Sequence, residues 1–291
     1  MEVITENNVN YYFNRMDKSI ILVLTGLNLS DEIDFYHNKN IKSIHISKYH
    51  GFSSDNLDIL KYFPDTEEIF IQNDFVNFAG IYSLGKLKKI NIAYFKNWVD
   101  LNNFPMLESL HITWNRKWDD FRQYAKLKEL TIWNFNPKSK CFTGIYFPSN
   151  LDELTINSSN ITSFKDLQYL NLKKFEGHYL NKLESLEELI KYNKSIESII
   201  LSHCKKIQDF STLNKGTALK KIILSACGSI ENISFIDGIQ NLEFFSFVGT
   251  IIIDGDISYC KRLKYTGFDN KKHYNFTMEQ MKSINIMYNK L

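Results

Sequence analysis

Four segments of the sequence share one apolar pattern: LESLHITWN (Leu107–Asn115), LKELTIWNF (Leu127–Phe135), IESIILSHC (Ile196–Cys204) and LKKIILSAC (Leu219–Cys227). In each of them, positions one, four and six are apolar. The same pattern begins at eight further residues: Ser19, Ile41, Thr66, Leu87, Leu151, Leu167, Leu242 and Leu263. The twelve starts are separated by 22, 25, 21, 20, 20, 24, 16, 29, 23, 23 and 21 residues, so a repeat of about 22 residues runs along nearly the whole chain.

The alternation within each repeat predicts a β-strand with one buried face. Positions one, four and six are apolar in 33 of 36 cases, whereas positions five and seven are apolar in only 7 of 24. Successive side chains of a strand point to opposite faces, so positions four and six turn inward and positions three, five and seven turn outward. Stacked repeats bury the inward side in a continuous core. We therefore expect about twelve parallel strands, with these position-six residues buried: Ile46, Ile71, Ile92, Ile112, Ile132, Ile156, Leu172, Leu201 and Leu224.

The pattern resembles that of the leucine-rich-repeat family, L-x-x-L-x-L-x-x-N/C-x-L. The resemblance implies an α/β fold, a solenoid with a curved parallel β-sheet on its concave face and loops and short helices on its convex face. It divides the chain into an N-terminal cap over residues 1–18, repeats over residues 19–271, and a helical C-terminal cap over residues 272–291. The asparagine position departs most from the family pattern, with Asn115 as the match, Cys204 and Cys227 as substitutes, and Phe95, Phe135 and Phe175 elsewhere.

Segments between the strands carry signals of their own. The segment LNKLESLEELIKY (residues 180–192) has leucines at helical spacing and predicts an amphipathic helix, and Asp55–Phe63 predicts a shorter one. In two consecutive repeats, apolar residues at identical offsets predict a buried return path: Ile207, Phe210 and Leu213, then Ile230, Ile233 and Ile236. Near the end, Thr277–Gln280 fits a capping box. The residues that would share one face of the following helix are Met281, Ile284, Tyr288 and Leu291; a last strand through Ile284 and Ile286 is the alternative.

Composition and charge exclude several classes of function. The 291 residues are 44% hydrophobic and 23% charged, which is typical of a folded protein and excludes disorder. With 35 basic and 33 acidic side chains the net charge is only +2, and no basic run concentrates it, so we expect no nucleic-acid partner. The longest aliphatic runs are Ile20–Leu24 and Ile251–Ile253, too short to cross a bilayer. The first residues, MEVITENNVN, lack the pattern of a secretory signal, and we expect a cytoplasmic protein.

No motif of enzyme chemistry occurs in the sequence. It contains no nucleophile elbow, phosphate-binding glycine loop or H-E-x-x-H motif, and its four cysteines form no C-x-x-C pair. His45 and His111 both occupy outward positions, but three repeats separate them, so they are interpreted as surface polar residues and not as ligands of one metal ion. Cys204 and Cys227 are interpreted as buried structural thiols. We expect no catalytic residue, metal or cofactor.

All four tryptophans fall within 36 residues, and their repeat positions divide them into two pairs. Trp98 and Trp118 fall at position twelve, which predicts stacked core aromatics. Trp133 falls at outward position seven and Trp114 at position eight, where exposed aromatics among polar groups indicate an interface. The candidate partner-binding residues on this concave strip are Phe70, Gln72, Asn91, Tyr94, His111, Thr113, Trp114, Glu129 and Trp133. The alternative is that these aromatics pack under a loop.

A second outward patch, which we call the late patch, consists of Ile200, Ile223, Phe244 and Val248. Contiguous exposed apolar surface marks partner sites, and cover by a terminal flap or a second copy of the chain is the alternative.

The resemblance implies a recognition module that binds another protein through its concave face and has no chemistry of its own. Degenerate repeats in a chain of this size further resemble dedicated inhibitors of a toxin or enzyme, including bacterial immunity proteins. The alternatives are a surface or secreted adhesin, similar to internalins in repeat length, and the recognition part of a bacterial ubiquitin ligase. The ligase needs a second, catalytic domain, and repeats from Ser19 to about Lys271 leave little room for one.

Overall fold

The structure is a computed structural model, and it describes residues 2–72, 75, 77–93, 99–116, 118–167 and 170–288. The chain divides into two compact units: unit 1 consists of residues 1–117 and 123–129, and unit 2 of residues 118–122 and 130–291.

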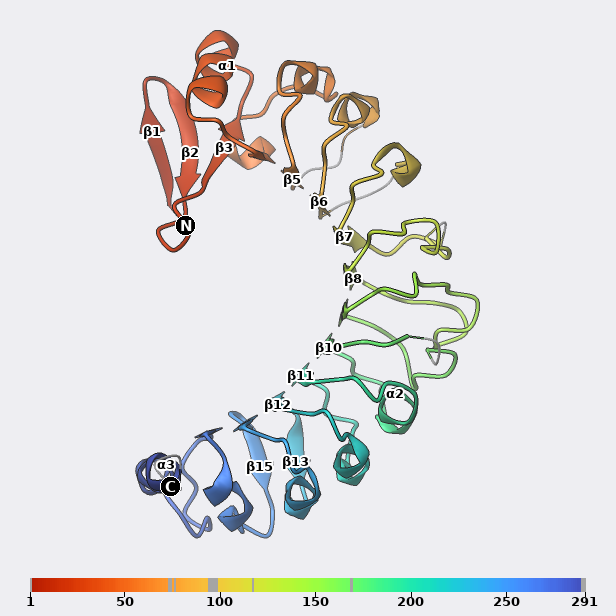
Figure 1. The fold of residues 1–291 in the computed structure, drawn as a ribbon, viewed down its shortest axis with the longest axis vertical. Coiled ribbons are helices and arrows are strands. Elements are labelled where there is room, and N and C mark those ends of the chain that lie inside the picture. The colour runs from red at the N-terminus through yellow and green to blue at the C-terminus, as the bar shows by residue number, and fades with distance from the viewer. Residues whose placement is uncertain are drawn as a thin grey trace. The chain divides into compact units, whose positions relative to one another are not determined.

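Unit 1 begins with an antiparallel hairpin that leads into a parallel sheet (Figure 1). Its strands are β1 (Val3–Glu6), β2 (Val9–Phe13), β3 (Ile20–Leu24), β4 (Ser43–Ile46), β5 (Glu68–Ile71), β6 (Lys89–Ile92) and β7 (Ser109–Thr113). Strand β2 pairs antiparallel with both β1 and β3, and from β3 onward each strand pairs parallel with the next. The register aligns equal positions of successive repeats, as in Ile44, Ile69, Ile90 and Leu110 at position four.

Helix α1 (Leu29–Asn38) fills the return path between β3 and β4, and the sequence pattern gave no sign of it. It buries Phe35 and Tyr36, and it also buries the carboxylate of Glu32. That carboxylate accepts hydrogen bonds from the Thr25 N–H (2.8 Å), the Thr25 hydroxyl (2.6 Å) and the Gly26 N–H (3.0 Å). The carboxyl group is buried with its hydrogen bonds made, which fixes the turn between strand and helix.

The other return paths of unit 1 contain short 3₁₀ helices: η1 (Lys48–His50), η2 (Asp58–Tyr62), η3 (Ala79–Ser83) and η4 (Leu101–Asn103). The expected helix over Asp55–Phe63 is therefore shorter, and of the 3₁₀ type. Asn56 and Asn77 accept hydrogen bonds from the backbone N–H two residues ahead, at the start of η2 and η3.

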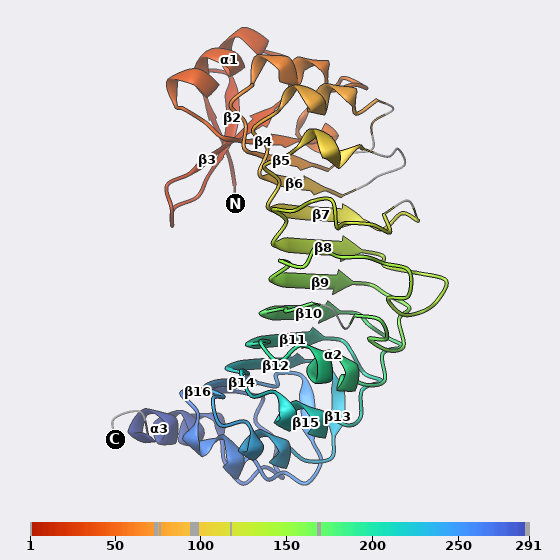
Figure 2. The ribbon, with the colours of Figure 1, turned by 45° about the vertical axis from the view of Figure 1, so that its right-hand side comes forward.

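Unit 2 contains seven strands of the repeat, and Figure 2 shows β9 to β12 as successive rungs. They are β8 (Glu129–Trp133, in unit 2 from Leu130), β9 (Glu153–Asn157), β10 (Lys174–His178), β11 (Ser198–Ser202), β12 (Lys221–Ser225), β14 (Phe244–Ser246) and β16 (Tyr265–Gly267). From β9 to β16 they pair parallel in this order. A second small sheet, which was not expected, joins β13 (Gly228–Ile230) to β15 (Thr250–Ile252) on the return path.

One predicted strand was placed wrongly. The pattern starting at Leu167 put Leu170 and Leu172 at positions four and six, whereas the strand of this repeat is β10, so the repeat starts at Leu172. Phe175 is consequently at position four and not at the asparagine position. Moving the start by five residues changes the intervals of 16 and 29 residues into 21 and 24. Position six of this repeat is Gly177, which has no apolar side chain to reveal the strand.

The helices of unit 2 differ in extent from those expected. Helix α2 covers only Glu187–Tyr192. The segment from Leu180 to Leu186 is a turn followed by irregular chain, and it buries the same leucines. The remaining short helices are η5 (Ser211–Lys215), η6 (Ser234–Gly238) and η7 (Ser258–Arg262).

Helix α3 (Met278–Tyr288) begins at the capping box, where the Gln280 side chain accepts from the Thr277 N–H (2.8 Å) and the Thr277 hydroxyl accepts from the Gln280 N–H (3.3 Å). Its buried face is Met281 and Asn285, while Tyr288 is exposed, so the expected apolar face through Tyr288 is wrong. Leu291 lies outside the described residues.

The core follows the repeat pattern. The nine residues expected to be buried at position six, among them Leu172, which the structure places at position one, are all at most 1% exposed. The two return-path sets are at most 2% exposed. We call the opposite face of the strands, which carries positions three, five and seven, the open face. Helices and turns lie on the other side of the strands in each unit (Figure 1).

Candidate functional site

The register of unit 1 places one row of side chains along position five of the open face. Phe70 pairs with Asn91 across β5 and β6, and Asn91 pairs with His111 across β6 and β7. All three side chains are half-buried. Three of the candidate residues therefore lie on adjacent strands, about 4.8 Å apart, as the sequence predicted.

Charged groups of both signs flank this row at position three. Glu68 pairs in register with Lys89, and the Glu68 carboxylate accepts a hydrogen bond from the Ser43 hydroxyl (2.7 Å). Burial lowers the pKa of His111, and Lys89 adds to this, while the carboxylates of Glu129 and Glu68 oppose it. Because the ordinary pKa of histidine is already near 6.5, His111 is neutral at pH 7. A neutral imidazole can donate one hydrogen bond and accept another.

The remaining candidate residues of unit 1 differ in availability. Gln72 and Glu129 are exposed, and Trp114 is half-buried. The Thr113 hydroxyl donates to the Ala93 carbonyl, so it is already used within the chain. Tyr94 and the predicted core residue Trp98 lie outside the described residues.

His45 corrects the expectation of a surface histidine. It stands in the same row as Phe70, yet it is only 5% exposed. The rings of Tyr12 and His50 lie over it, with centroids 5.4 and 5.3 Å from its own. Sequence periodicity could not show this burial, because both covering residues come from outside the strand pattern.

Trp133 lies in unit 2, at the carboxyl end of β8, and is 46% exposed as its outward position predicted. Trp118 is 2% exposed and stacks on Phe121 with 6.3 Å between ring centroids, which confirms it as a core aromatic.

The open face of β9 and β10 carries an ion cluster that the misplaced repeat concealed. Glu176 Oε1 lies 2.8 Å from Lys174 Nζ, and Glu176 Oε2 lies 3.1 Å from His178 Nε2. Lys174 also lies 3.1 Å from Glu153. The hydrogen bond from His178, with support from Lys174, lowers the pKa of Glu176 to about 2 although burial opposes it. The signal that could have revealed this cluster is the pair of irregular intervals around Leu167.

The late patch is partly covered by its own neighbours. Ile200, Ile223 and Phe244 are half-buried, whereas Val248 is 47% exposed. The Phe244 ring stacks on Tyr265, with centroids 4.4 Å apart and an interplanar angle of 14°, and Lys221 Nζ lies 5.1 Å from the Phe244 centroid.

The cysteines are buried, as interpreted from the sequence. Cys204 and Cys227 are fully buried, and their thiols lie 3.5 Å from the Gly177 carbonyl oxygen and 3.6 Å from the Leu201 carbonyl oxygen. Burial raises the pKa of Cys260 to about 12, which disfavours the reactive thiolate. In the part of the chain that the structure describes, no three His, Cys, Asp or Glu side chains group as metal ligands, and no helix is long and apolar enough to span a bilayer.

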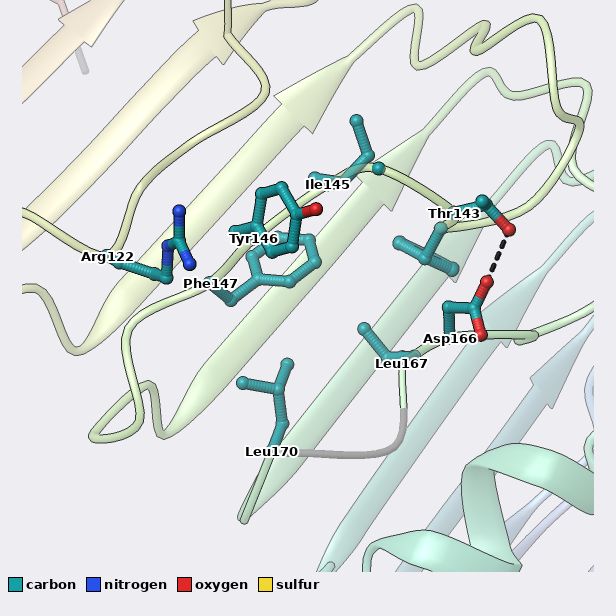
Figure 3. Close-up of a pocket in the computed structure, with 10 residues that line it drawn as sticks. Arg122, Thr143, Ile145, Tyr146, Phe147, Asp166, Leu167 and Leu170 are labelled. Carbon is teal, nitrogen blue, oxygen red and sulfur yellow. Dashed lines mark hydrogen bonds between the residues drawn. The ribbon is translucent and has the colours of Figure 1, made fainter.

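A cavity of about 470 Å³ lies on the return side of unit 2 (Figure 3). Its apolar lining includes Phe142, Ile145 and Leu167. Arg122 lies at one end. The Arg122 guanidinium lies 4.2 Å from the Tyr146 ring centroid and 2.6 Å from the Asp120 carboxylate. At the other end, the Thr143 hydroxyl donates to Asp166. The charged groups that line the described part of this cavity are therefore already paired.

Comparison with known proteins identifies the fold. No protein-family model matches the sequence, and no match was found among proteins of curated function. Among solved structures, the chain is similar to the internalin InlF of Listeria monocytogenes, with 16% identity, a TM-score of 0.54, and coverage of 89% of this chain and 75% of that one. A leucine-rich-repeat protein of Leptospira interrogans is similar with 13% identity, a TM-score of 0.46, and coverage of 89% and 79%. The chain has the fold of an α/β leucine-rich-repeat solenoid, and at these identities the likeness is one of fold.

Proposed function

We propose that this protein is a binding module for another protein and that it uses the open face of unit 1. The observation that carries the proposal is the row of Phe70, Asn91 and His111, three half-buried side chains of different chemistry on adjacent strands. Each already has part of its surface against the sheet, so less side-chain freedom is lost when a partner covers the rest.

The chemistry of the row favours anchoring over electrostatic steering. An aromatic ring, an amide and a neutral imidazole offer one apolar contact and several hydrogen bonds, the mixture found at interface hot spots. Glu68 and Lys89 flank the row with opposite charges and Glu129 adds one carboxylate, so the net charge beside the row is small. A folded protein surface fits this row better than a nucleic acid or a membrane.

The finer proposal is that the partner is a toxin or an enzyme and that this protein is its dedicated inhibitor in the cytoplasm, as immunity proteins are. Support comes from the resemblance of the degenerate repeats to such inhibitors. An adhesin-type protein is the second candidate, and it predicts binding to the surface of intact cells instead of to one soluble protein.

The experiment has two stages. The full chain is first used to capture binding proteins from its native host, and the recovered partner is purified and titrated by calorimetry against the wild type, Phe70→Ala and His111→Ala. Both variants should weaken binding at least tenfold, about 1.4 kcal/mol. Tyr62→Ala is the matched control, because Tyr62 is an exposed aromatic residue of η2 on the return side of the same unit.

The outcomes distinguish the proposed binding face from other surfaces, and an inhibitor from an adhesin. Equal affinity of the wild type, Phe70→Ala and His111→Ala overturns the assignment of this face. Loss of the partner's activity at one equivalent of the chain supports the inhibitor. Binding to intact cells, with no soluble partner recovered, supports the adhesin.

A further inference from the structure

The open-face row of unit 1 is closed at its N-terminal end. Position five of β3 and β4 carries Val23 and His45, in register with Phe70, and both are buried, at 0% and 5% exposure. Tyr12 from β2 and His50 from η1 cover His45, and we call these two side chains the roof. The same row is half-buried and accessible from Phe70 onward.

The roof is held by contacts among the three rings. The Tyr12 hydroxyl oxygen and His50 Nε2 are 2.8 Å apart and share a hydrogen bond. The ring centroids of Tyr12 and His50 are 5.8 Å apart, and all three pairs of rings meet nearly edge to face. These contacts suit neutral rings, since a positive imidazolium beneath the roof would have to give up its water.

The surroundings of His45 favour its neutral form. Its Nδ1 atom is buried and has no hydrogen-bond partner among the described residues, so a proton placed there would be an unsatisfied charged donor. Burial lowers the pKa of His45 and the neighbouring His50 lowers it further, while a hydrogen bond with Gln72 acts in the opposite direction.

Among the described residues, none with a negative charge packs against His45. The titratable groups that face it are Tyr12 on β2 and His50 on η1, with Tyr49 against His50 at a centroid distance of 5.0 Å. Lys48 of η1 is paired with Asp55 at 3.0 Å, and β5 contributes the apolar Phe70.

We propose that the roof is a pH-dependent cover: acidification protonates His45, the roof lifts, and the open-face row extends back from Phe70 to His45. The functional consequence of this inference rests on the proposed function, because the surface exposed at low pH continues the proposed binding row. The cover itself is a property of the isolated chain.

The sign and size of the effect follow from linkage. The pKa of His45 is lower under the roof than in the open state, so the closed state is favoured above about pH 6.5 and loses that advantage as the pH falls. An open-state imidazole of ordinary pKa multiplies the opening equilibrium by about 1.1 at pH 7.5 and by about 11 at pH 5.5. Opening should therefore increase over this interval, by at most about tenfold.

The test uses the full chain without a partner. The nuclear Overhauser contact between the Tyr12 and His45 rings, and hydrogen exchange of the His50 and Gly51 amides, are measured at pH 7.5 and 5.5, with exchange corrected for its intrinsic pH dependence. The wild type should show a weaker ring contact and more opening at pH 5.5 than at pH 7.5, by at most about tenfold. His45→Phe, which keeps an aromatic ring but does not titrate, should show neither change. If it fails to fold, His45→Gln serves the same comparison.

His37→Gln is the matched control, because His37 is an exposed histidine of the same unit outside the roof, and it should behave as the wild type. A wild type with equal opening at both pH values overturns the proposal, as does a His45 variant that keeps the pH response. Because these readouts need no partner, their failure is distinct from a failure of the Phe70 and His111 variants to weaken binding.

Discussion

Lys220 Nζ lies 2.9 Å from Glu197 Oε2, and the two side chains are one step of a ladder of alternating charge. Both occupy position two of their repeats, and in each repeat the strand begins at the next residue. In unit 2 this position carries Asp152, Lys173, Glu197, Lys220, Glu243 and Lys264, and in unit 1 it carries Lys42, Glu67, Lys88, Glu108 and Lys128. Acidic and basic residues alternate without a break in each unit. If one repeat were skipped in the stack, two side chains of like charge would therefore lie side by side.

Reversing one charge should expose the contribution of this ladder. Glu197→Lys places three lysines in succession, so attraction to Lys173 and Lys220 becomes repulsion. These side chains are about half exposed, and we expect the free energy of unfolding to fall by about 1 kcal/mol at low salt. Urea unfolding measures this, and 1 M NaCl should remove most of the difference. Glu184→Lys, an exposed change of equal charge off the ladder, is the control, and an equal loss there would contradict the prediction.

The inward positions should be far more sensitive than the ladder. Ile112 and Leu201 are fully buried at position six of β7 and β11, so truncation of either leaves a cavity. We expect Ile112→Ala and Leu201→Ala each to cost about 2 to 5 kcal/mol. Thermal melting and urea unfolding provide the measurement, with the exposed Val248→Ala as control. Melting temperatures within one or two degrees of the parent would rule out the packing described for these positions.

Glu176 makes part of the stability dependent on pH. Its folded pKa of about 2 lies below its ordinary value of 4.5, so the stabilisation is complete above about pH 5 and is lost as the pH falls toward 2. Between pH 7 and pH 3 the wild type should lose about 2 kcal/mol more than Glu176→Gln. Urea unfolding at the two pH values gives this difference, and Glu184→Gln should behave as the wild type. An unchanged pH dependence in Glu176→Gln would show that the contacts with His178 and Lys174 do not persist in solution.

Most of the fold could be predicted because apolar alternation alone decides which side of a strand is buried. The prediction failed at one strand, where Gly177 occupies position six. The side chains of Leu180, Leu201 and Phe175 fill the space there, since an added Cβ would lie 2.6, 3.0 and 3.1 Å from their nearest atoms. This part of the core is apolar, but the side chains that fill it come from other sequence positions. The apolar pattern of the repeat itself therefore does not reveal the strand.

Gly177→Ala should therefore destabilise the protein, in contrast to the usual effect of alanine in place of glycine. The new methyl group must displace the Leu180 and Leu201 side chains, and we expect a cost of about 1 to 3 kcal/mol. Gly85→Ala is the control, because an added Cβ there has nothing within 4 Å. Urea unfolding compares the two variants, and equal stability would mean that the leucines repack without cost.

The sequence predicted which face of the sheet carries the side chains of the candidate site, but not whether those side chains are accessible. Position numbers placed His111 and Trp133 outward, and both face outward in the structure. The same reasoning placed His45 outward, where Tyr12 and His50 bury it. Tyr12 and His45 are 33 residues apart in the sequence. The repeat periodicity does not predict contacts between such distant segments.

Trp133 gives unit 2 its own test of partner binding. Its indole is 46% exposed at an outward strand position, and tryptophan is among the residues enriched at interface hot spots. Trp133→Ala should weaken binding of the captured partner at least tenfold, about 1.4 kcal/mol, while the melting temperature stays near that of the parent. Titration calorimetry measures the affinity, and Tyr192→Ala is the matched control, because Tyr192 is a 40%-exposed aromatic of helix α2 in the same unit. If Trp133→Ala binds normally and Ile223→Ala or Phe244→Ala does not, the partner contacts the late patch and Trp133 lies outside the interface, although the fold assignment is unaffected.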